Sequence, residues 1–170
     1  MSDTANGFAP VVGEQAHVLI LGSMPGRRSL RDGAYYAHPQ NAFWRIVGSI
    51  YGFDDKADYQ HRTRSLANAG VALWDVLGRC ERPGSLDADI DPKSVIENDF
   101  AAFFAKHDGI RSILFNGATA ERYYLKRVQP NMLPAVQALV RQRLPSTSPA
   151  HASMSFEQKL MHWQDALSNA

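Results

Sequence analysis

The segment Val18-Leu19-Ile20-Leu21-Gly22-Ser23-Met24-Pro25-Gly26 decides the fold class. Four consecutive apolar residues run directly into a turn built from glycine, serine and proline. A short apolar run bounded by turn residues is typical of a strand that is buried on both faces, as in the centre of a parallel sheet. The segment therefore predicts a buried strand over residues 18–21, with a tight loop at its carboxyl end.

Similar apolar runs recur further along the chain, and amphipathic segments separate them. Two more strands are predicted over residues 71–74 and 113–115, and residues 136–144 form either a strand or the end of a helix. Helices are predicted over residues 42–51, 62–69, 94–104 and 118–128, and from an N-cap at Ser155 to Leu167, with a loop over residues 87–91. Alternating strands and helices indicate an α/β fold with a short, mainly parallel sheet and helices on both faces.

Composition limits the class of protein. The chain has 170 residues, 45% hydrophobic and 21% charged, which suits one domain over residues 1–170 and argues against disorder. No apolar run approaches the ~18 residues of a membrane helix, and residues 1–13 lack the pattern of a secretory signal. Cys80 is the single cysteine, so a disulfide framework is excluded. We expect a cytoplasmic protein.

Basic residues gather at two places although the net charge is only +1. Arg27, Arg28 and Arg31 follow the first turn, and Arg141 and Arg143 precede a second turn rich in proline and serine. Such clusters are either solvated surface charges or phosphate contacts.

Four polar loops follow the predicted strands. They begin at Gly22, Trp74-Asp75, Asn116 and Leu144. Because ligands of open α/β sheets bind at the carboxyl ends of the strands, we expect these loops to meet at one edge. The first loop lacks the Lys-Ser/Thr ending of a P-loop and the third glycine of a dinucleotide fingerprint, which disfavours nucleoside triphosphates and NAD. Taken alone, it favours a plain turn over a phosphate-binding turn.

A more specific block is Tyr35-Tyr36-Ala37-His38-Pro39-Gln40-Asn41-Ala42-Phe43-Trp44. With this block the chain resembles the uracil-DNA glycosylase superfamily, most closely its hypoxanthine (deoxyinosine) DNA glycosylase branch. The resemblance covers residues 22–44, 70–77, 115–118 and 144–151. It implies a three-layer αβα sandwich that flips a nucleotide out of duplex DNA into a pocket.

The resemblance implies a role for each part of this pocket. Tyr36 stands where the family places an aromatic ring that stacks on the extruded base; the alternative is a half-buried core tyrosine. Many relatives carry Asp or Asn one residue before the first proline, where this chain has Met24. We therefore assign the positioning of the attacking water to Asn41, whose alternative role is to cap the helix that follows.

The departing base needs hydrogen-bond partners. A carboxamide complements the adjacent acceptor and donor of hypoxanthine, so Asn116 is the first candidate, against a plain turn role. Asp75 is the second candidate, although its charge would repel the base anion unless burial keeps it protonated; pairing with an arginine is the alternative. Ser23 and Met24 complete the expected base pocket.

The last loop resembles the segment that enters the minor groove. Pro145, Ser146, Thr147 and Ser148 are expected to contact DNA, with His151 either there or in a surface role. From the first loop, Gly22, Pro25 and Gly26 are expected DNA contacts. Relatives often have histidine where this chain has Leu144, a second departure from ordinary uracil chemistry. Met154 is either a wedge or a core residue.

The sequence therefore predicts a monofunctional DNA glycosylase without cofactor or metal, acting as a monomer on double-stranded DNA that contains a damaged base, in the cytoplasm at the nucleoid. Hypoxanthine is the preferred base because of the resemblance. Uracil shows the same hydrogen-bonding edge, so a uracil or G·T/G·U mismatch glycosylase stays open. A non-catalytic module that binds damaged DNA is the alternative from another class.

Overall fold

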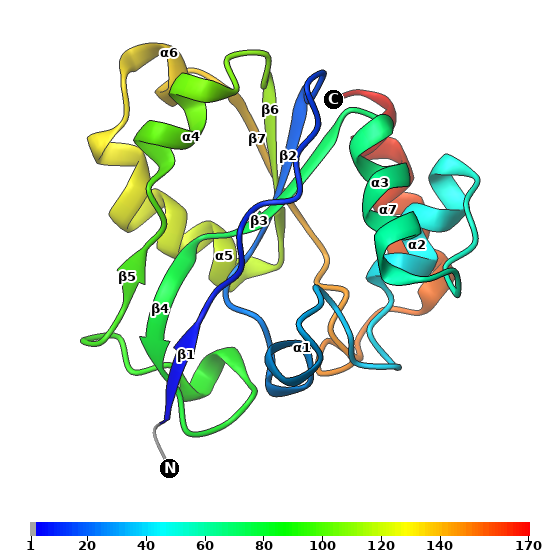
Figure 1. Ribbon diagram of the computed structural model, residues 1–170, viewed down its shortest axis with the longest axis horizontal. Helices are drawn as coiled ribbons and strands as arrows, with labels where there is room; N and C mark the ends of the chain where they lie inside the picture. The colour runs from blue at the N-terminus through cyan, green and yellow to red at the C-terminus, as the bar shows by residue number, and fades with distance from the viewer. Residues whose placement is uncertain (1–2) are drawn as a thin grey trace.

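A computed structural model describes residues 3–170 and places a four-stranded parallel sheet at the centre of the molecule (Figure 1). The strands lie in the order β3–β2–β6–β7, with bounds β2 Val18–Gly22, β3 Val71–Asp75, β6 Ser112–Asn116 and β7 Val140–Leu144. All three neighbouring pairs are parallel. Strand β2 is buried along its whole length, which confirms the strand predicted from the opening segment.

Helices cover both faces of this sheet, as Figure 1 shows. One face carries α2 Phe43–Tyr51, α3 Tyr59–Asn68 and α7 Phe156–Ser168; the other carries α4 Phe100–Lys106, α5 Ala118–Tyr123 and α6 Pro134–Gln137. A π-helical turn, Tyr124–Val128, and a 3-10 turn, Gln129–Asn131, link α5 to α6. The expected αβα sandwich is confirmed. None of the helices within residues 3–170 has the length and apolar character needed to cross a membrane.

The helix predicted over residues 94–104 is wrong in its first half. The helix α4 begins at Phe100, because the Asp99 carboxylate accepts a hydrogen bond from the Ala102 amide at 3.0 Å and caps it there. The preceding residues form β5, Ile96–Glu97, which pairs antiparallel with β4, Leu77–Glu81. Strand β4 also pairs with β1, Thr4–Asn6, so a second, three-stranded sheet flanks the first.

The ambiguous stretch over residues 136–144 contains both alternatives in succession. It closes the short helix α6 and then forms β7, whose first four residues are exposed. Strand β7 is one of the two outer strands of the parallel sheet and, unlike the buried outer strand β3, it is exposed along most of its length, so it lacks the apolar run that reveals the other three. Two short elements complete the fold beside the carboxyl ends of the strands: α1, Arg27–Asp32, and a 3-10 turn, Asp87–Asp89.

Candidate active site

The loops that follow the four parallel strands meet at one edge of the sheet, where α1 also lies (Figure 1). The Gly117 amide donates to the Leu144 carbonyl at 3.1 Å, which joins the loops after β6 and β7. The Ala42 amide donates to the Thr147 carbonyl at 3.0 Å, which joins the aromatic block to the last loop. The predicted convergence is therefore present.

Gly22 closes β2 beside two other predicted site residues. A Cβ atom at this position would collide with the Asp75 carboxylate and would lie 2.9 Å from the Tyr36 hydroxyl oxygen. Any side chain at residue 22 would have to displace both groups. Gly22, Met24 and Pro25 are themselves buried, so they shape the floor of this region through backbone position.

Tyr36 is held in an unusual conformation. Its φ of 53° makes it the one non-glycine residue with a positive φ in residues 3–170. Its ring stacks on Phe43 with centroids 4.2 Å apart, so one face of the ring is already covered. A flipped base could stack only on the other face. The backbone strain is consistent with a ring fixed for binding, since such strain persists where surrounding structure enforces it.

The Tyr36 hydroxyl is buried and has no hydrogen-bond partner among the described residues. Burial raises its pKa well above the usual range, and the negative charge of Asp75 raises it further. The Asn116 side chain is close enough to offset part of this rise, but its hydrogen bonds go to Thr147. The Tyr36 side chain is therefore uncharged, and its ring is held in place against Phe43.

Asp75 is 3% exposed, and its Oδ2 atom has no partner among the described residues. Burial raises the pKa of its carboxyl to about 7, with the negative charge of Asp87 adding to the rise and Arg82 opposing it. No arginine forms an ion pair with Asp75 within residues 3–170. Near neutral pH this carboxyl is therefore partly protonated, which removes much of the repulsion expected toward a base anion.

Asn41 lies just before α2, and its side-chain oxygen accepts a hydrogen bond from the Phe43 amide at 3.0 Å. This contact satisfies the first amide of α2 and competes with the catalytic interpretation, although the N-cap residue of the helix is Ala42 and not Asn41 as the alternative predicted. A carboxamide oxygen has two lone pairs, so one stays available for a water molecule. Asn41 is half-buried and its neighbour Ala42 contacts the last loop, which keeps Asn41 at the meeting point of the loops.

Asn116 ends β6 and is bound at both ends of its amide by one residue. Its Nδ2 donates to the Thr147 hydroxyl and its Oδ1 accepts from the Thr147 amide, both at 2.9 Å. Thr147 is 1% exposed, so it lies inside the loop and does not face DNA as expected. The second N–H of the Asn116 amide is not used in this pair.

The last loop is fastened to α7. The Trp163 indole donates to the Pro145 carbonyl at 3.0 Å, and the Lys159 ammonium donates to the His151 carbonyl at 2.8 Å. The Ser146 hydroxyl oxygen accepts from the Ser148 amide, and the Ser148 oxygen accepts from the Ala150 amide, each at 3.2 Å. Neither hydroxyl donates to another of the described residues, so both can donate to a phosphate. Met154 is half-buried.

One segment at this edge was not predicted as part of the site. The Ser23 hydroxyl donates to Asp87 Oδ1 at 2.6 Å, and the Arg82 guanidinium donates to the Pro25 carbonyl at 2.5 Å. The Arg27 amide donates to the Ser85 hydroxyl at 3.3 Å. Residues 82–87 therefore support the first loop from outside. The residues in these contacts are about 60 positions apart in the sequence, so no local sequence pattern predicts them.

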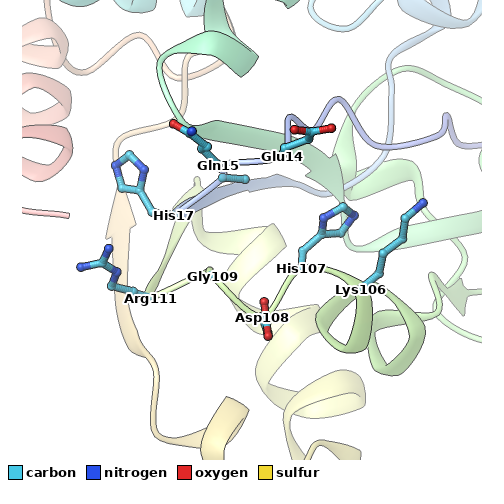
Figure 2. A pocket seen from close by; sticks show the side chains of 9 residues that line it. Glu14, Gln15, His17, Lys106, His107, Asp108, Gly109 and Arg111 are labelled. Carbon is cyan, nitrogen blue, oxygen red and sulfur yellow. The ribbon is translucent and has the colours of Figure 1, made fainter.

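The opposite edge of the sheet has different chemistry. A cavity of about 440 Å³ lies where β2 and β6 begin, and Figure 2 shows acidic and basic side chains interspersed around it, among them Glu14, His17, Asp108 and Arg111. It is separated from the converging loops by the length of the strands. Within residues 3–170 no group of His, Cys, Asp and Glu side chains is arranged to hold a metal ion.

The fold and this edge define a class of protein. The sequence model of the uracil DNA glycosylase superfamily matches residues 9–168, and the chain belongs to that superfamily as a DNA glycosylase. Two proteins named hypoxanthine DNA glycosylase are similar to it. The one from Methanosarcina barkeri is 39% identical over 118 residues, which are 69% of this chain and 73% of the relative. The one from Methanosarcina acetivorans is 38% identical over 119 residues, with the same coverage.

A solved structure is similar over nearly the whole chain. It is the solution NMR structure of a candidate uracil DNA glycosylase from Methanosarcina acetivorans, with a TM-score of 0.80 and 30% identity. The match covers 98% of each chain.

Proposed function

We propose that this DNA glycosylase releases hypoxanthine from deoxyinosine in double-stranded DNA. The names of the two relatives at 38–39% identity support the choice of base. The observation that carries the proposal is the hydrogen-bonded junction at Thr147, which brings Asn116, the Asn41 segment and the last loop together beside Tyr36. The enzyme would act as a monomer at the nucleoid, in base excision repair.

The reaction is a hydrolysis. A water oxygen bonds to C1′ of the deoxyribose while the bond from C1′ to N9 of hypoxanthine breaks, and the electron pair of that bond stays on the base. A proton transferred from water neutralises the base, and an abasic sugar remains in the strand. The transition state resembles an oxocarbenium ion, so the site must position water and stabilise the departing base.

Tyr36 and Asn41 divide the first tasks. The flipped base stacks on the face of Tyr36 that Phe43 leaves free. The Asn41 oxygen, already fixed by the Phe43 amide, accepts the second hydrogen bond from the attacking water. Because the capping contact holds the amide in one orientation, the water is positioned without further ordering.

Asn116 and Asp75 act on the departing base. The second N–H of the Asn116 amide, which Thr147 does not use, donates a hydrogen bond to O6 of hypoxanthine, where negative charge develops. Protonated Asp75 leaves the region without an opposing charge, consistent with its pKa of about 7. The free hydroxyl protons of Ser146 and Ser148 donate to phosphates flanking the lesion.

The second candidate is uracil or mismatch glycosylase activity. It is favoured by the similarity over 98% of the chain to a structure named as a candidate uracil DNA glycosylase. Uracil shares the acceptor-and-donor edge that Asn116 would read, so only the size of the occupied pocket separates the two bases.

The test is a panel of duplexes containing one deoxyinosine, one deoxyuridine or one G·T mismatch, with abasic products cleaved by alkali. We expect release from deoxyinosine to be fastest, and Asn41→Ala protein prepared in parallel to be the control for contaminating glycosylases. Fast release of uracil with no release of hypoxanthine would replace the first proposal by the second. No release from any duplex would refute both.

A further inference from the structure

A second cavity, of about 300 Å³, is lined by residues that have no part in the proposed reaction. Its lining includes Arg27 and Leu30 of α1, Arg82 and Gly84 of the segment after β4, and Asp3 at its exposed rim. It adjoins the first loop, because Arg82 donates to the Pro25 carbonyl. The cavity therefore sits at the same end of the molecule as the converging loops.

Arg82 is buried and incompletely bonded. It is 3% exposed, although charged side chains are rarely buried without a partner. Its Nε donates to the Gly84 carbonyl at 3.1 Å and its Nη2 to the Pro25 carbonyl at 2.5 Å. Its Nη1 has no acceptor among the described residues. A buried charged donor left without an acceptor is costly, so this side chain is suited to receive one.

Neither arginine of the cavity has a counter-ion. Within residues 3–170, no carboxylate lies within ion-pair distance of Arg27 or Arg82. Among the residues that the structure describes, the Arg27 guanidinium donates only to the Pro83 carbonyl. Burial lowers the pKa of Arg82, and the positive charge of Arg27 acts in the same direction, against the opposing effects of Cys80, Asp87 and Asp75. Two neighbouring cations around one cavity favour an anion.

We propose that Arg27 and Arg82 form a phosphate-binding pocket whose occupant is a backbone phosphate of the DNA substrate. Guanidinium groups bind phosphate oxygens through paired N–H donors. The cavity is larger than one phosphate group needs, and Leu30 offers an apolar contact for the attached sugar. Because Arg82 also holds Pro25, an occupant would brace the first loop. The assignment to DNA rests on the proposed function; the pocket itself does not.

The first experiment uses inorganic phosphate and the protein alone. Titration followed by NMR of the arginine side-chain N–H groups should show saturable shifts in wild type. Arg27→Ala should lose them, while Arg111→Ala, which removes an arginine at the far edge of the sheet, should keep them. Asp3→Asn should tighten binding because it removes the acid at the rim. Equal binding by Arg27→Ala and wild type would overturn the pocket.

Since Arg82 is buried, its replacement can impair folding. Arg82→Lys keeps the charge but loses the planar guanidinium group with its paired N–H donors. We therefore expect weaker phosphate binding, with a far-ultraviolet circular dichroism spectrum like that of wild type. Should this variant not fold, Arg27→Ala carries the test, because Arg27 is exposed.

The second experiment uses duplexes containing a stable abasic-site analogue, so that no base release is required. Arg27→Ala should weaken binding about tenfold at low salt and reduce the slope of log affinity against log salt by about 1, with Arg111→Ala as the control. Replacing single phosphates by uncharged methylphosphonates should reveal one position that weakens wild type but not Arg27→Ala.

The outcomes separate the sources of phosphate. One methylphosphonate position that weakens binding by wild type but not by Arg27→Ala assigns the pocket to DNA. Phosphate binding without such a position contradicts the DNA assignment and points to a free phosphate ligand. If wild type binds abasic DNA but releases no base, the proposed function fails while the pocket stands.

Discussion

Asp75 is a carboxyl group in a place where its charge is poorly stabilised. In the unfolded chain it titrates near its ordinary pKa of 3.8, and in the folded protein near 7. The folded state therefore binds the proton more tightly, so the stability of the protein falls as pH rises from about 4 to about 7 and then levels.

Replacing Asp75 by Asn should remove this loss. We compare the free energy of unfolding of Asp75→Asn with that of wild type at each pH. This difference should be more favourable to the variant at pH 8 than at pH 4, by up to about 4 kcal/mol. Urea denaturation at both pH values measures this, with the exposed Asp91→Asn as control. The same difference between Asp75→Asn and wild type at both pH values would contradict a buried, proton-binding carboxyl.

Asn41 combines a structural and a proposed catalytic contact, and two variants separate them. Asn41→Ala should cost about 1 kcal/mol of stability through the lost cap and should slow base release about 100-fold or more, with DNA affinity nearly unchanged. Asn41→Ser keeps an oxygen that can cap the Phe43 amide, so it should recover stability but not rate. Single-turnover rates and thermal melting measure both. Full activity in Asn41→Ser would remove Asn41 from catalysis.

Tyr36 offers a similar separation between ring and hydroxyl. Tyr36→Phe removes a buried hydroxyl that has no partner among the described residues, so we expect unchanged or slightly higher stability and an unchanged rate. Tyr36→Ala should lose about 1–3 kcal/mol of flipped-base binding. Fluorescence of 2-aminopurine beside the lesion reports flipping. Equal flipping by the Ala and Phe variants would exclude stacking on this ring.

At the scale of elements, α7 acts as the support of the last loop. Lys159 is 5% exposed and donates to backbone carbonyls at residues 148 and 151, with no carboxylate paired to it in residues 3–170. Burial lowers the pKa of its ammonium group. Since a buried cation without a counter-ion contributes little to folding, its value lies in the conformation of the loop.

Lys159→Met should therefore leave global stability within about 1 kcal/mol of wild type while loosening residues 145–151. Faster amide exchange in that loop and weaker binding of abasic duplex are the expected results. Lys106→Met, which alters an exposed lysine at the far edge, is the control. A loop as protected as in wild type would show that Trp163 alone holds it.

Sequence patterns predicted the elements whose own residues carry the signal, such as an apolar run or a capping residue. The buried strands β2, β3 and β6 are short apolar runs, and Ser155 caps α7 by accepting from the Gln158 amide, as expected. The missed elements depend on distant partners. Strands β1 and β5 have three and two residues and exist only by pairing with β4. The support of the first loop by residues 82–87 is likewise invisible to local patterns.

For the site, residue types were easier to predict than their contacts. The rule that parallel strands end at one edge placed Gly22, Asp75 and Asn116 together, and the structure agrees. The partner of Asn116 could not be read from sequence, because its amide binds Thr147, 31 residues away in the last loop. Asn41 differs, since its side-chain oxygen binds the Phe43 amide in its own segment. Thr147 is the instructive case, since a polar loop residue turned out to be buried.

At the scale of the whole molecule, the two edges of the sheet should respond differently to DNA. Binding of abasic duplex should slow amide exchange at residues 22–27, 36–42, 116–117 and 145–151, which gather at the carboxyl edge (Figure 1). Residues 106–111, around the cavity of Figure 2, should not change. Hydrogen exchange with mass spectrometry measures both. Protection confined to the far edge would contradict DNA binding at the carboxyl edge of the sheet.

Thr147 gives this architecture an evolutionary consequence. Its carbonyl holds Ala42 and its amide and hydroxyl hold Asn116, so one residue ties the segment proposed to direct water to the segment proposed to recognise the base. A mutation that shifts Asn116 to suit a different lesion would also shift Asn41. Base preference and turnover in this lineage should therefore change together, and new substrates should arise by coordinated replacements at both segments.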